Sequence, residues 1–395
     1  MLDDIMKPYR EHPLTDRAKK VMTSGNTRST LFIPPAPPYA VSGSGCILTD
    51  NLNHQVIDLN NNYTAMIHGH SYEPINKVVV DQLSKGTAFG LPTESDVALA
   101  EVMAARTGIQ YWRFSNSGTE ALMTAIRGAR AFTGRDVIVR FAGSYHGSHE
   151  VFVDPTAAGI PKTTSQVVVA LPQGNKAEFD RVMAEMGTQV AAVVLDLMPN
   201  RAGLVPADQS FVQHLRESTL KYGSLLVIDE VITFRVGVGG MHKEYGISPD
   251  LISVGKVMGG GFPVGGVGGS QEIMSVFDPI RSGTVSLGGT FSANPVTMRA
   301  GKVAMDNFGL NEVERLNGLG ENLRAQLRES GVKVSGFGSL ARLHEDVDLN
   351  NLWWEMYSRG VLAGTTTLMS LSTPMSQGHI DEIVKVIKQS LEAVK

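Results

Sequence analysis

Short apolar runs alternate with amphipathic segments through the middle of this 395-residue chain. The runs are rich in Val and Ile and lie at 137–139, 167–170, 191–195, 225–228 and 251–254. Between them, the spacing of apolar residues predicts helices at Ser117–Ala131, Lys176–Met186 and Gln209–Tyr222. Alternating buried strands and helices are typical of an α/β fold with a mostly parallel sheet covered on both faces. Ligands of such sheets bind at the carboxyl ends of the strands.

The two ends of the chain follow other patterns. Residues 1–24 are predicted to form a helical arm, and four prolines between 34 and 38 predict an extended segment after it. Long helices are expected after about residue 295, and a final amphipathic helix at Gln377–Val394. We therefore expect three parts, which are an N-terminal arm (1–50) contributing to the small domain and a dimer interface, a large domain (51–300) and a small α+β domain (301–395).

Composition narrows the class of protein. Apolar residues make up 42% and charged residues 19% of the chain, which is enough to build a sizeable core. The net charge of −4 argues against a nucleic-acid partner, and no run of 18 apolar residues predicts a membrane span. The N-terminus lacks the apolar segment of a secretory signal, and Cys46 has no second cysteine to pair with. These features favour a reducing, cytoplasmic location.

A candidate phosphate site follows the strand predicted at 111–114. Ser117, Gly118 and Thr119 open a helix there, and Ser117 with Glu120 fits a capping box. The start of a helix offers free N–H groups and a positive dipole end, which suits a phosphate group. An ordinary well-capped helix would show the same residues.

Two ionisable residues directly follow buried strands. Asp229 is costly at such a position unless it is paired, and a cationic ring nitrogen would pair it, although a magnesium ion or a helix cap is an alternative. Lys256 precedes a glycine-rich run, and a desolvated lysine amine forms Schiff bases. The alternative for Lys256 is a surface lysine. One strand-crossover-strand step separates the two residues, so both side chains could reach the same crevice.

Two further turns complete the set. Tyr145 and His146 lie in a glycine turn after the strand at 137–141, where the tyrosine could stack on a flat ring. Metal binding is disfavoured because acid partners at metal-ligand spacing are absent, so we expect no metal. Gly289-Thr290 resembles a second phosphate-contacting turn. A lysine, a strand-end acid, a stacking ring and phosphate turns together are what a pyridoxal phosphate enzyme needs.

The sequence resembles the class III, fold-type I aminotransferases, in the branch that includes glutamate-1-semialdehyde aminomutase. The matching strings are SNSGTEA, SYHG, VIDEV, PDLISVGKVMGGGFPVGGVGG and GGTFSANP. The resemblance implies pyridoxal 5′-phosphate as cofactor and a large domain with a mostly parallel seven-stranded sheet beside a smaller α+β domain. It also implies a homodimer with shared active sites.

The same resemblance implies roles for individual residues. Lys256 would be the Schiff-base lysine, and Asp229 the partner of the pyridine nitrogen. The other cofactor contacts that it implies are Tyr145 with His146, Val231 or Ile232, the phosphate ligands Ser117, Gly118 and Thr119, and Thr290 from the partner subunit.

The chain departs from the family pattern in places that concern the substrate. Asp196-Leu197 stands where the family usually has Glu-Pro, and an unusual stretch follows up to Arg201. The loop after Asp229 is shorter than in the aminomutase and looks more like the branch acting on β-amino acids. In that branch an arginine matching Arg28 is expected to hold the substrate carboxylate, and Arg201 is a second candidate. Alternatively, Arg28 only ties down the arm and Arg201 is a surface residue.

We therefore expect an aminotransferase that moves an amino group from a carboxylate-bearing amine, with β-amino acids as one candidate, to a 2-keto acid. Lys256 would carry the proton between substrate and cofactor. A glutamate-1-semialdehyde-type intramolecular aminomutase and an amino acid racemase are the alternatives within the family. A catalytically silent cofactor-binding protein and a nucleotide-binding α/β protein are the alternatives outside it.

Overall fold

The computed structural model describes residues 2–395 and contains two compact units. One unit is formed by residues 73–314, and the other by the segment ending at Tyr72 together with residues 315–395. The boundaries between the units lie after Tyr72 and Glu314, whereas the sequence patterns suggested boundaries after residues 50 and 300. The three-part domain division stays a prediction.

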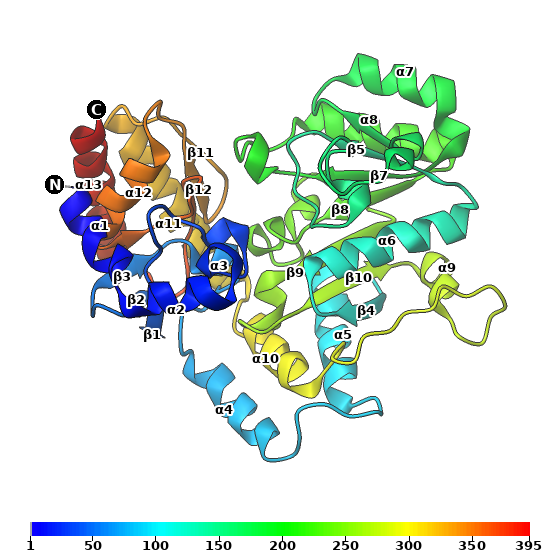
Figure 1. The fold of residues 1–395 in the computed structure, drawn as a ribbon. Coiled ribbons are helices and arrows are strands. Elements are labelled where there is room, and N and C mark those ends of the chain that lie inside the picture. Colours follow the sequence, from blue (N-terminus) through cyan, green and yellow to red (C-terminus); the bar gives the residue numbers. More distant parts are fainter. Residues whose placement is uncertain (1) are drawn as a thin grey trace. The chain divides into compact units, whose positions relative to one another are not determined.

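The unit of residues 73–314 is built on a seven-stranded sheet (Figure 1). Its strand order is β4-β10-β9-β8-β7-β5-β6, and only β10 runs antiparallel to its neighbours. The strands are β4 (Tyr111–Ser115), β5 (Val137–Phe141), β6 (Val168–Leu171), β7 (Val190–Asp196), β8 (Leu225–Asp229), β9 (Leu251–Gly255) and β10 (Gly265–Gly269). The mostly parallel α/β sheet expected from the sequence is confirmed.

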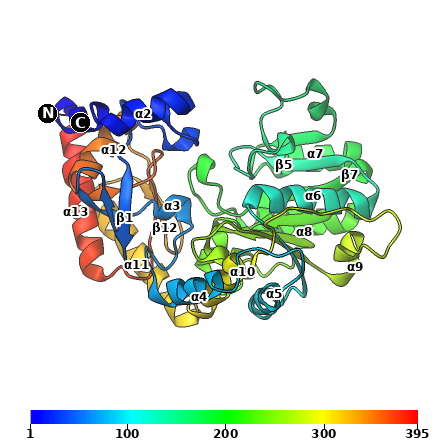
Figure 2. The ribbon, with the colours of Figure 1, turned by 60° about the horizontal axis from the view of Figure 1, so that its bottom comes forward.

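The inner strands of this sheet are apolar because both of their faces are covered. Every residue of β5, β7, β8 and β9 is buried. Helix α6 (Gly118–Thr133) covers one face, while α7 (Lys176–Met186) and α8 (Gln209–Tyr222) cover the other (Figures 1 and 2). The side chains of α6 form one hydrophobic cluster with the sheet. Because β7, β8 and β9 run parallel to one another, their carboxyl ends lie at the same edge of the sheet.

Strand β10 was not predicted, because its sequence GGVGG lacks the residues that favour strands. Glycine is required at two of these positions because neighbouring atoms leave no room for a side chain. A Cβ atom on Gly265 would lie 2.0 Å from the carbonyl oxygen of Ser117, and one on Gly268 would lie 2.8 Å from the indole of Trp112. Strand β10 can therefore pass between β4 and β9 only if it lacks these side chains.

Three longer helices complete this unit. Two of them are α4 (Glu73–Leu83) and α5 (Glu94–Thr107). Both pack on α10 (Pro295–Asp306), which begins at a proline behind the capping residue Asn294. A short helix, α9 (Gln271–Met274), follows β10.

The second unit holds two small antiparallel-rich sheets and several helices. One sheet has the order β1-β2-β3-β13 and the other β11-β12-β14. Its strands are β1 (Ala40–Ser44), β2 (Ile47–Asp50), β3 (Gln55–Asp58), β11 (Val334–Ser335), β12 (Leu340–Leu343), β13 (Val361–Leu362) and β14 (Leu368–Ser370), and its helices are α1 (Leu2–Arg10), α2 (Pro13–Val21), α3 (Asn61–Thr64), α11 (Leu310–Glu329), α12 (Leu349–Ser358) and α13 (Gln377–Val394). Within residues 2–395, every helix is too short or too polar to cross a bilayer.

The helical arm predicted at the N-terminus consists of two helices, α1 and α2. Pro13 starts α2, and the side chain of His12 caps it by accepting a hydrogen bond from the Leu14 N–H. Helix α1 packs on α12, which lies beside α13 (Figures 1 and 2). The hydroxyl groups of Tyr9 and Tyr357 both donate to Asp50 at 2.8 Å, so polar as well as aromatic contacts hold α1 in place.

Candidate active site

Lys256 lies directly after β9, at the carboxyl edge of the seven-stranded sheet. Its φ angle is +49°, a left-handed conformation that is uncommon for a residue other than glycine and is often found at functional sites. Burial lowers the pKa of the amine to about 8, and the nearby cation of Arg235 acts in the same direction. The carboxylates of Asp229 and Asp196 oppose this shift. A lysine with so low a pKa is a ready nucleophile and base near neutral pH.

Asp229 ends β8, the neighbouring strand, and three hydrogen-bonding partners orient its carboxylate. One oxygen, Oδ2, lies 2.7 Å from Nδ1 of the buried His146. The other, Oδ1, accepts hydrogen bonds from the Val231 N–H at 3.0 Å and the Ser253 hydroxyl at 3.2 Å. Nε2 of His146 is buried and has no hydrogen-bond partner within residues 2–395. Asp229 and His146 thus form an oriented pair in which Nε2 of the histidine still needs a hydrogen-bond partner.

The start of α6 forms a third part of the site. Ser117 caps the helix by accepting a hydrogen bond from the Glu120 N–H at 3.2 Å, and Glu120 accepts one from the Asn116 N–H. Ser117 therefore caps the helix as predicted, but the Glu120 side chain binds the N–H of Asn116 instead of that of Ser117, so the capping box is only half formed. The N–H groups of the first helical turn, at Gly118 and Thr119, point along the axis and have no acceptor inside the helix.

Glycines bring the α6 start, the strand ends and the 143–147 turn close together. A Cβ atom on Gly118 would lie 2.9 Å from the side chain of Val231, just beyond Asp229. One on Gly147 would lie 2.3 Å from the hydroxyl of Thr119. The lysine, the aspartate, the histidine and the helix start consequently lie close together at the carboxyl edge of the sheet.

Tyr145 and Arg201 form a stacked pair beside this region. The guanidinium carbon of Arg201 lies 4.3 Å from the centre of the Tyr145 ring. The loops that carry them touch, because a Cβ atom on Gly143 would lie 2.7 Å from Cβ of Ala202. Arg201 is an exposed residue whose guanidinium covers the ring of Tyr145. Its role in substrate binding stays a prediction.

Other residues singled out from the sequence lie elsewhere in this unit. Ile232 is partly buried after β8, and Thr290 is exposed in the loop before α10. Thr290 lines a cavity of about 250 Å³ together with Phe89, Leu91 and Ser292. Glu230, which follows Asp229 in the sequence, accepts hydrogen bonds from the backbone N–H groups of Met241 and His242. Its role is therefore to hold that turn in place.

Comparisons with known proteins agree with this arrangement. The model of the class III aminotransferases matches residues 35–391. The chain belongs to this family. A glutamate-1-semialdehyde 2,1-aminomutase of Methanothermobacter thermautotrophicus is 35% identical over 81% of this chain and 78% of its own. A crystal structure of an omega-transaminase from Sphaerobacter thermophilus has a TM-score of 0.93 and 40% identity over 98% of this chain and 99% of its own. The structure of a beta-phenylalanine aminotransferase from Variovorax paradoxus has a TM-score of 0.90 and 29% identity, and the match covers 100% of this chain and 98% of its own.

Class III aminotransferases use pyridoxal 5′-phosphate, and the residues of this member fit it. The fit rests on a buried anion at Asp229, an unpartnered buried Nε2 on His146 and a glycine-lined helix start. An anion suits a protonated ring nitrogen, and the helix start suits the phosphate. The expected fold class, enzyme class and cofactor are confirmed, whereas the roles of single residues stay predictions.

Two buried charged residues of the site were not assigned roles from the sequence. Asp196 ends β7 in register with Asp229, and Arg235 is completely buried in the turn after β8. Burial lowers the pKa of Arg235 to about 9. Asp196 carried a signal, because it replaces the usual Glu-Pro at a strand end. Arg235 carried none, since nothing in the sequence tells a buried arginine from an exposed one.

Asp196 predicts a pH-dependent stability for the cofactor-free protein. Burial, followed by the charge of Asp229, raises its pKa to about 7 from the ordinary 3.8. The folded state then keeps a proton that the unfolded state loses near pH 4, so stability falls as pH rises towards 7. Asp196→Asn cannot ionise. We expect its melting temperature, relative to the parent protein, to be higher at about pH 8 than at about pH 5. An equal difference at both pH values would contradict the shifted pKa.

The Arg201–Tyr145 stack makes a second prediction. A cation over an exposed aromatic ring contributes about 0.5–1 kcal/mol, so Arg201→Gln should weaken cofactor binding by roughly 2- to 5-fold when Tyr145 contacts the cofactor ring. The measurement is titration of cofactor-free protein, with Arg181→Gln on the exposed face of α7 as control. An unchanged cofactor affinity with a raised KM for carboxylate donors would instead make Arg201 a substrate ligand.

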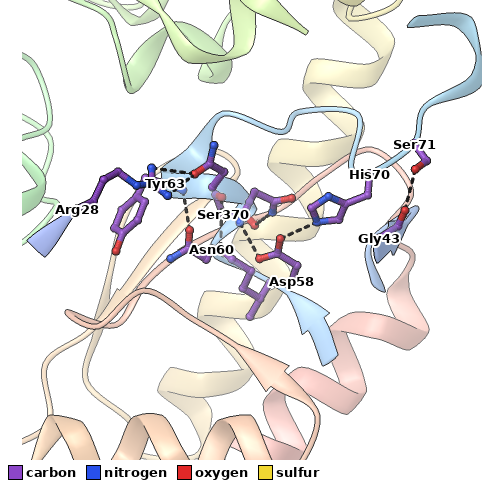
Figure 3. Close-up of polar contacts among 11 residues, drawn as sticks. Arg28, Gly43, Asp58, Asn60, Tyr63, His70, Ser71 and Ser370 are labelled. Carbon is purple, nitrogen blue, oxygen red and sulfur yellow. Dashed lines mark hydrogen bonds and ion pairs between the residues drawn. The ribbon is translucent and has the colours of Figure 1, made fainter. Parts of the chain in front are cut away.

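Arg28 belongs to the other unit and is described with it. Its guanidinium donates two hydrogen bonds of 3.2 Å to Oδ1 of Asn62 and lies 5.7 Å from the centre of the Tyr63 ring (Figure 3). It lines a cavity of about 360 Å³ whose other walls are largely apolar and include Ile33, Leu48, Trp353, Tyr357 and Leu362. Arg28 therefore supplies a cation at the wall of a largely apolar cavity.

Proposed function

We propose that this class III enzyme transfers the amino group of a carboxylate-bearing amine with an apolar side chain, of which a β-amino acid is the first candidate, to a 2-keto acid. The observation that carries this proposal is the cavity around Arg28. It offers one guanidinium fork for a carboxylate and apolar walls for the remainder of the donor.

The proposed work of the strand-end residues follows from their charges. Lys256 would hold the cofactor through Nζ, and the same atom would take a proton from the substrate carbon and later return it. With its pKa lowered to about 8, the amine is partly unprotonated near neutral pH, as a general base must be. Bound pyridoxal 5′-phosphate supplies an electron-withdrawing ring that stabilises the electron pair left on the substrate carbon.

Asp229 and the helix start would hold the cofactor in place. The carboxylate of Asp229, oriented by His146 and Ser253, would keep the ring nitrogen protonated. The first-turn N–H groups at Gly118 and Thr119 would bind the phosphate, with Thr290 of a partner subunit as a further expected ligand. Tyr145 would stack on one ring face, while Val231 or Ile232 would pack on the other.

An intramolecular aminomutase is the second candidate. It is favoured by curated relatives that are named glutamate-1-semialdehyde 2,1-aminomutase and are 32–36% identical over as much as 96% of this chain. Such a reaction keeps the amino group on one carbon skeleton, so it needs no keto acid.

The test is a panel of amine donors assayed with and without pyruvate or 2-oxoglutarate. We expect 3-amino-3-phenylpropanoate to be consumed only when a keto acid is present, with a keto product formed. Consumption of glutamate 1-semialdehyde without a keto acid would assign the aminomutase reaction instead. Absence of turnover with every carboxylate-bearing donor, in protein that holds its cofactor, would refute the proposed function.

A further inference from the structure

The backbone beside Arg28 is strained over four consecutive residues. Asn61, Asn62, Tyr63 and Thr64 have φ angles of +48°, +49°, +56° and +76°, so the short segment labelled α3 is a left-handed turn. Asparagine tolerates this region, but tyrosine and the β-branched threonine do so at a cost. Such strain persists only where the surrounding structure enforces it, and it is concentrated at functional sites.

Side-chain hydrogen bonds enforce the turn (Figure 3). Oδ1 of Asp58 accepts from the Asn61 N–H at 2.8 Å, and Oδ1 of Asn60 accepts from the Tyr63 N–H at 2.6 Å. The Asn61 amide donates to the carbonyl oxygen of Ser370 at 2.7 Å. The other oxygen of Asp58 is held by Nε2 of His70 at 2.8 Å. The turn is thus fixed from several directions.

The fixed turn positions the side-chain amide of Asn62 against the guanidinium of Arg28. Its Oδ1 accepts from both terminal nitrogens of Arg28, and therefore occupies the fork in which a carboxylate would bind. Asn62 and Arg28 both line the 360 Å³ cavity. The neighbouring Tyr63 lies under the guanidinium, and its hydroxyl donates to the carbonyl of Thr30.

We propose that Asn62 determines specificity for a carboxylate by acting as the displaceable ligand of Arg28. This inference rests on the proposed function and names how its substrate is recognised. A neutral amide oxygen keeps the guanidinium oriented without neutralising it. A substrate carboxylate, with its charge and two oxygens, forms the stronger bidentate pair and replaces the amide.

The test replaces the neutral ligand by a charged one. Asn62→Asp retains a residue type that tolerates the left-handed conformation, and it puts a permanent carboxylate in the fork. Asn53→Asp is the matched control, because Asn53 is an exposed asparagine of the same unit with the same left-handed backbone, and it lies outside the lining of the cavity. The probe is 3-phenylpropanoate, a carboxylate without an amine, titrated into the holoenzyme by calorimetry.

We expect Asn62→Asp to weaken binding of 3-phenylpropanoate by about tenfold or more, as one charged hydrogen-bonded pair is replaced by a competing one. Asn53→Asp should change binding of 3-phenylpropanoate by less than about threefold, the size of a surface charge effect. In an Arg28→Gln background the effect of Asn62→Asp should disappear, because the double-mutant cycle isolates the interaction between the two residues. The KM for 1-phenylethylamine, which lacks a carboxylate, should stay unchanged.

Several results would overturn the role of Asn62. The first is that the parent enzyme does not bind 3-phenylpropanoate. The second is that the effect of Asn62→Asp is no larger than that of Asn53→Asp, and the third is that the effect persists without Arg28. The proposed function fails differently, because it is refuted when no carboxylate-bearing amine is turned over, even if 3-phenylpropanoate binding follows the expected pattern. Binding and turnover therefore separate the two conclusions.

Discussion

Replacing Lys256 by alanine is expected to reduce transamination by about 10³-fold or more, because a positioned proton-transfer group contributes about 10²–10⁴-fold and covalent attachment of the cofactor is lost with it. The lysine is buried, has a pKa lowered to about 8 and has a left-handed backbone. The measurements are kcat with the preferred donor, and peptide mapping after borohydride reduction, which should mark residue 256 in the parent enzyme only.

The control for this prediction is Lys302→Ala, which removes an exposed lysine paired with Asp306 on α10. It should leave both kcat and the borohydride-labelled peptide unchanged. Labelling of any lysine other than Lys256 in the parent enzyme would refute the assignment. Near-normal turnover by the Lys256→Ala protein would do the same.

Asp229→Asn is expected to lower kcat/KM by about 10²-fold, since removal of one preorganised electrostatic contact in a dry site costs about 10²–10³-fold. The substitution keeps the shape of the side chain but removes the charge that would hold the ring nitrogen protonated. Asp229 is 4% exposed, so water cannot substitute for the lost charge. Steady-state kinetics of cofactor-loaded protein measure the effect.

The adjacent carboxylate supplies the comparison. Glu230→Gln removes a charge that binds the 241–242 backbone and His242, so it should lower the melting temperature and leave kcat/KM of the folded holoenzyme within about threefold. If the two variants lose activity equally, the effect of Asp229 is structural and the proposed role of its charge is wrong.

The parts of the site that lie within single motifs could be predicted from the sequence. Asp229 and Lys256 each directly follow an apolar run, and parallel strands place such residues at one edge. Ser117 caps α6 by accepting a hydrogen bond from the Glu120 N–H, which is a local pattern. Strand β10 could not be predicted, because its glycines are explained only by the closeness of Trp112 and Ser117, which are far away in the sequence.

The substrate side shows the opposite case. Nothing near Arg28 in the sequence indicates that Asn62 accepts its hydrogen bonds, because 34 residues separate them. The same holds for Arg201 and Tyr145, whose stack depends on two loops that follow different strands. Contacts between distant segments depend on how the strands are ordered in the sheet, which local patterns do not encode.

The order of residues along the chain was enough to determine the α/β class, the family and the cofactor, because each is carried by short patterns that occur next to strand ends. Only the tertiary structure decided which charges are buried together and what each one contacts. Asp196 acquires its raised pKa beside Asp229, and Arg28 acquires its amide ligand, through register and packing. Burial and pairing are properties of three-dimensional neighbours, and these set the electrostatics on which the chemistry depends.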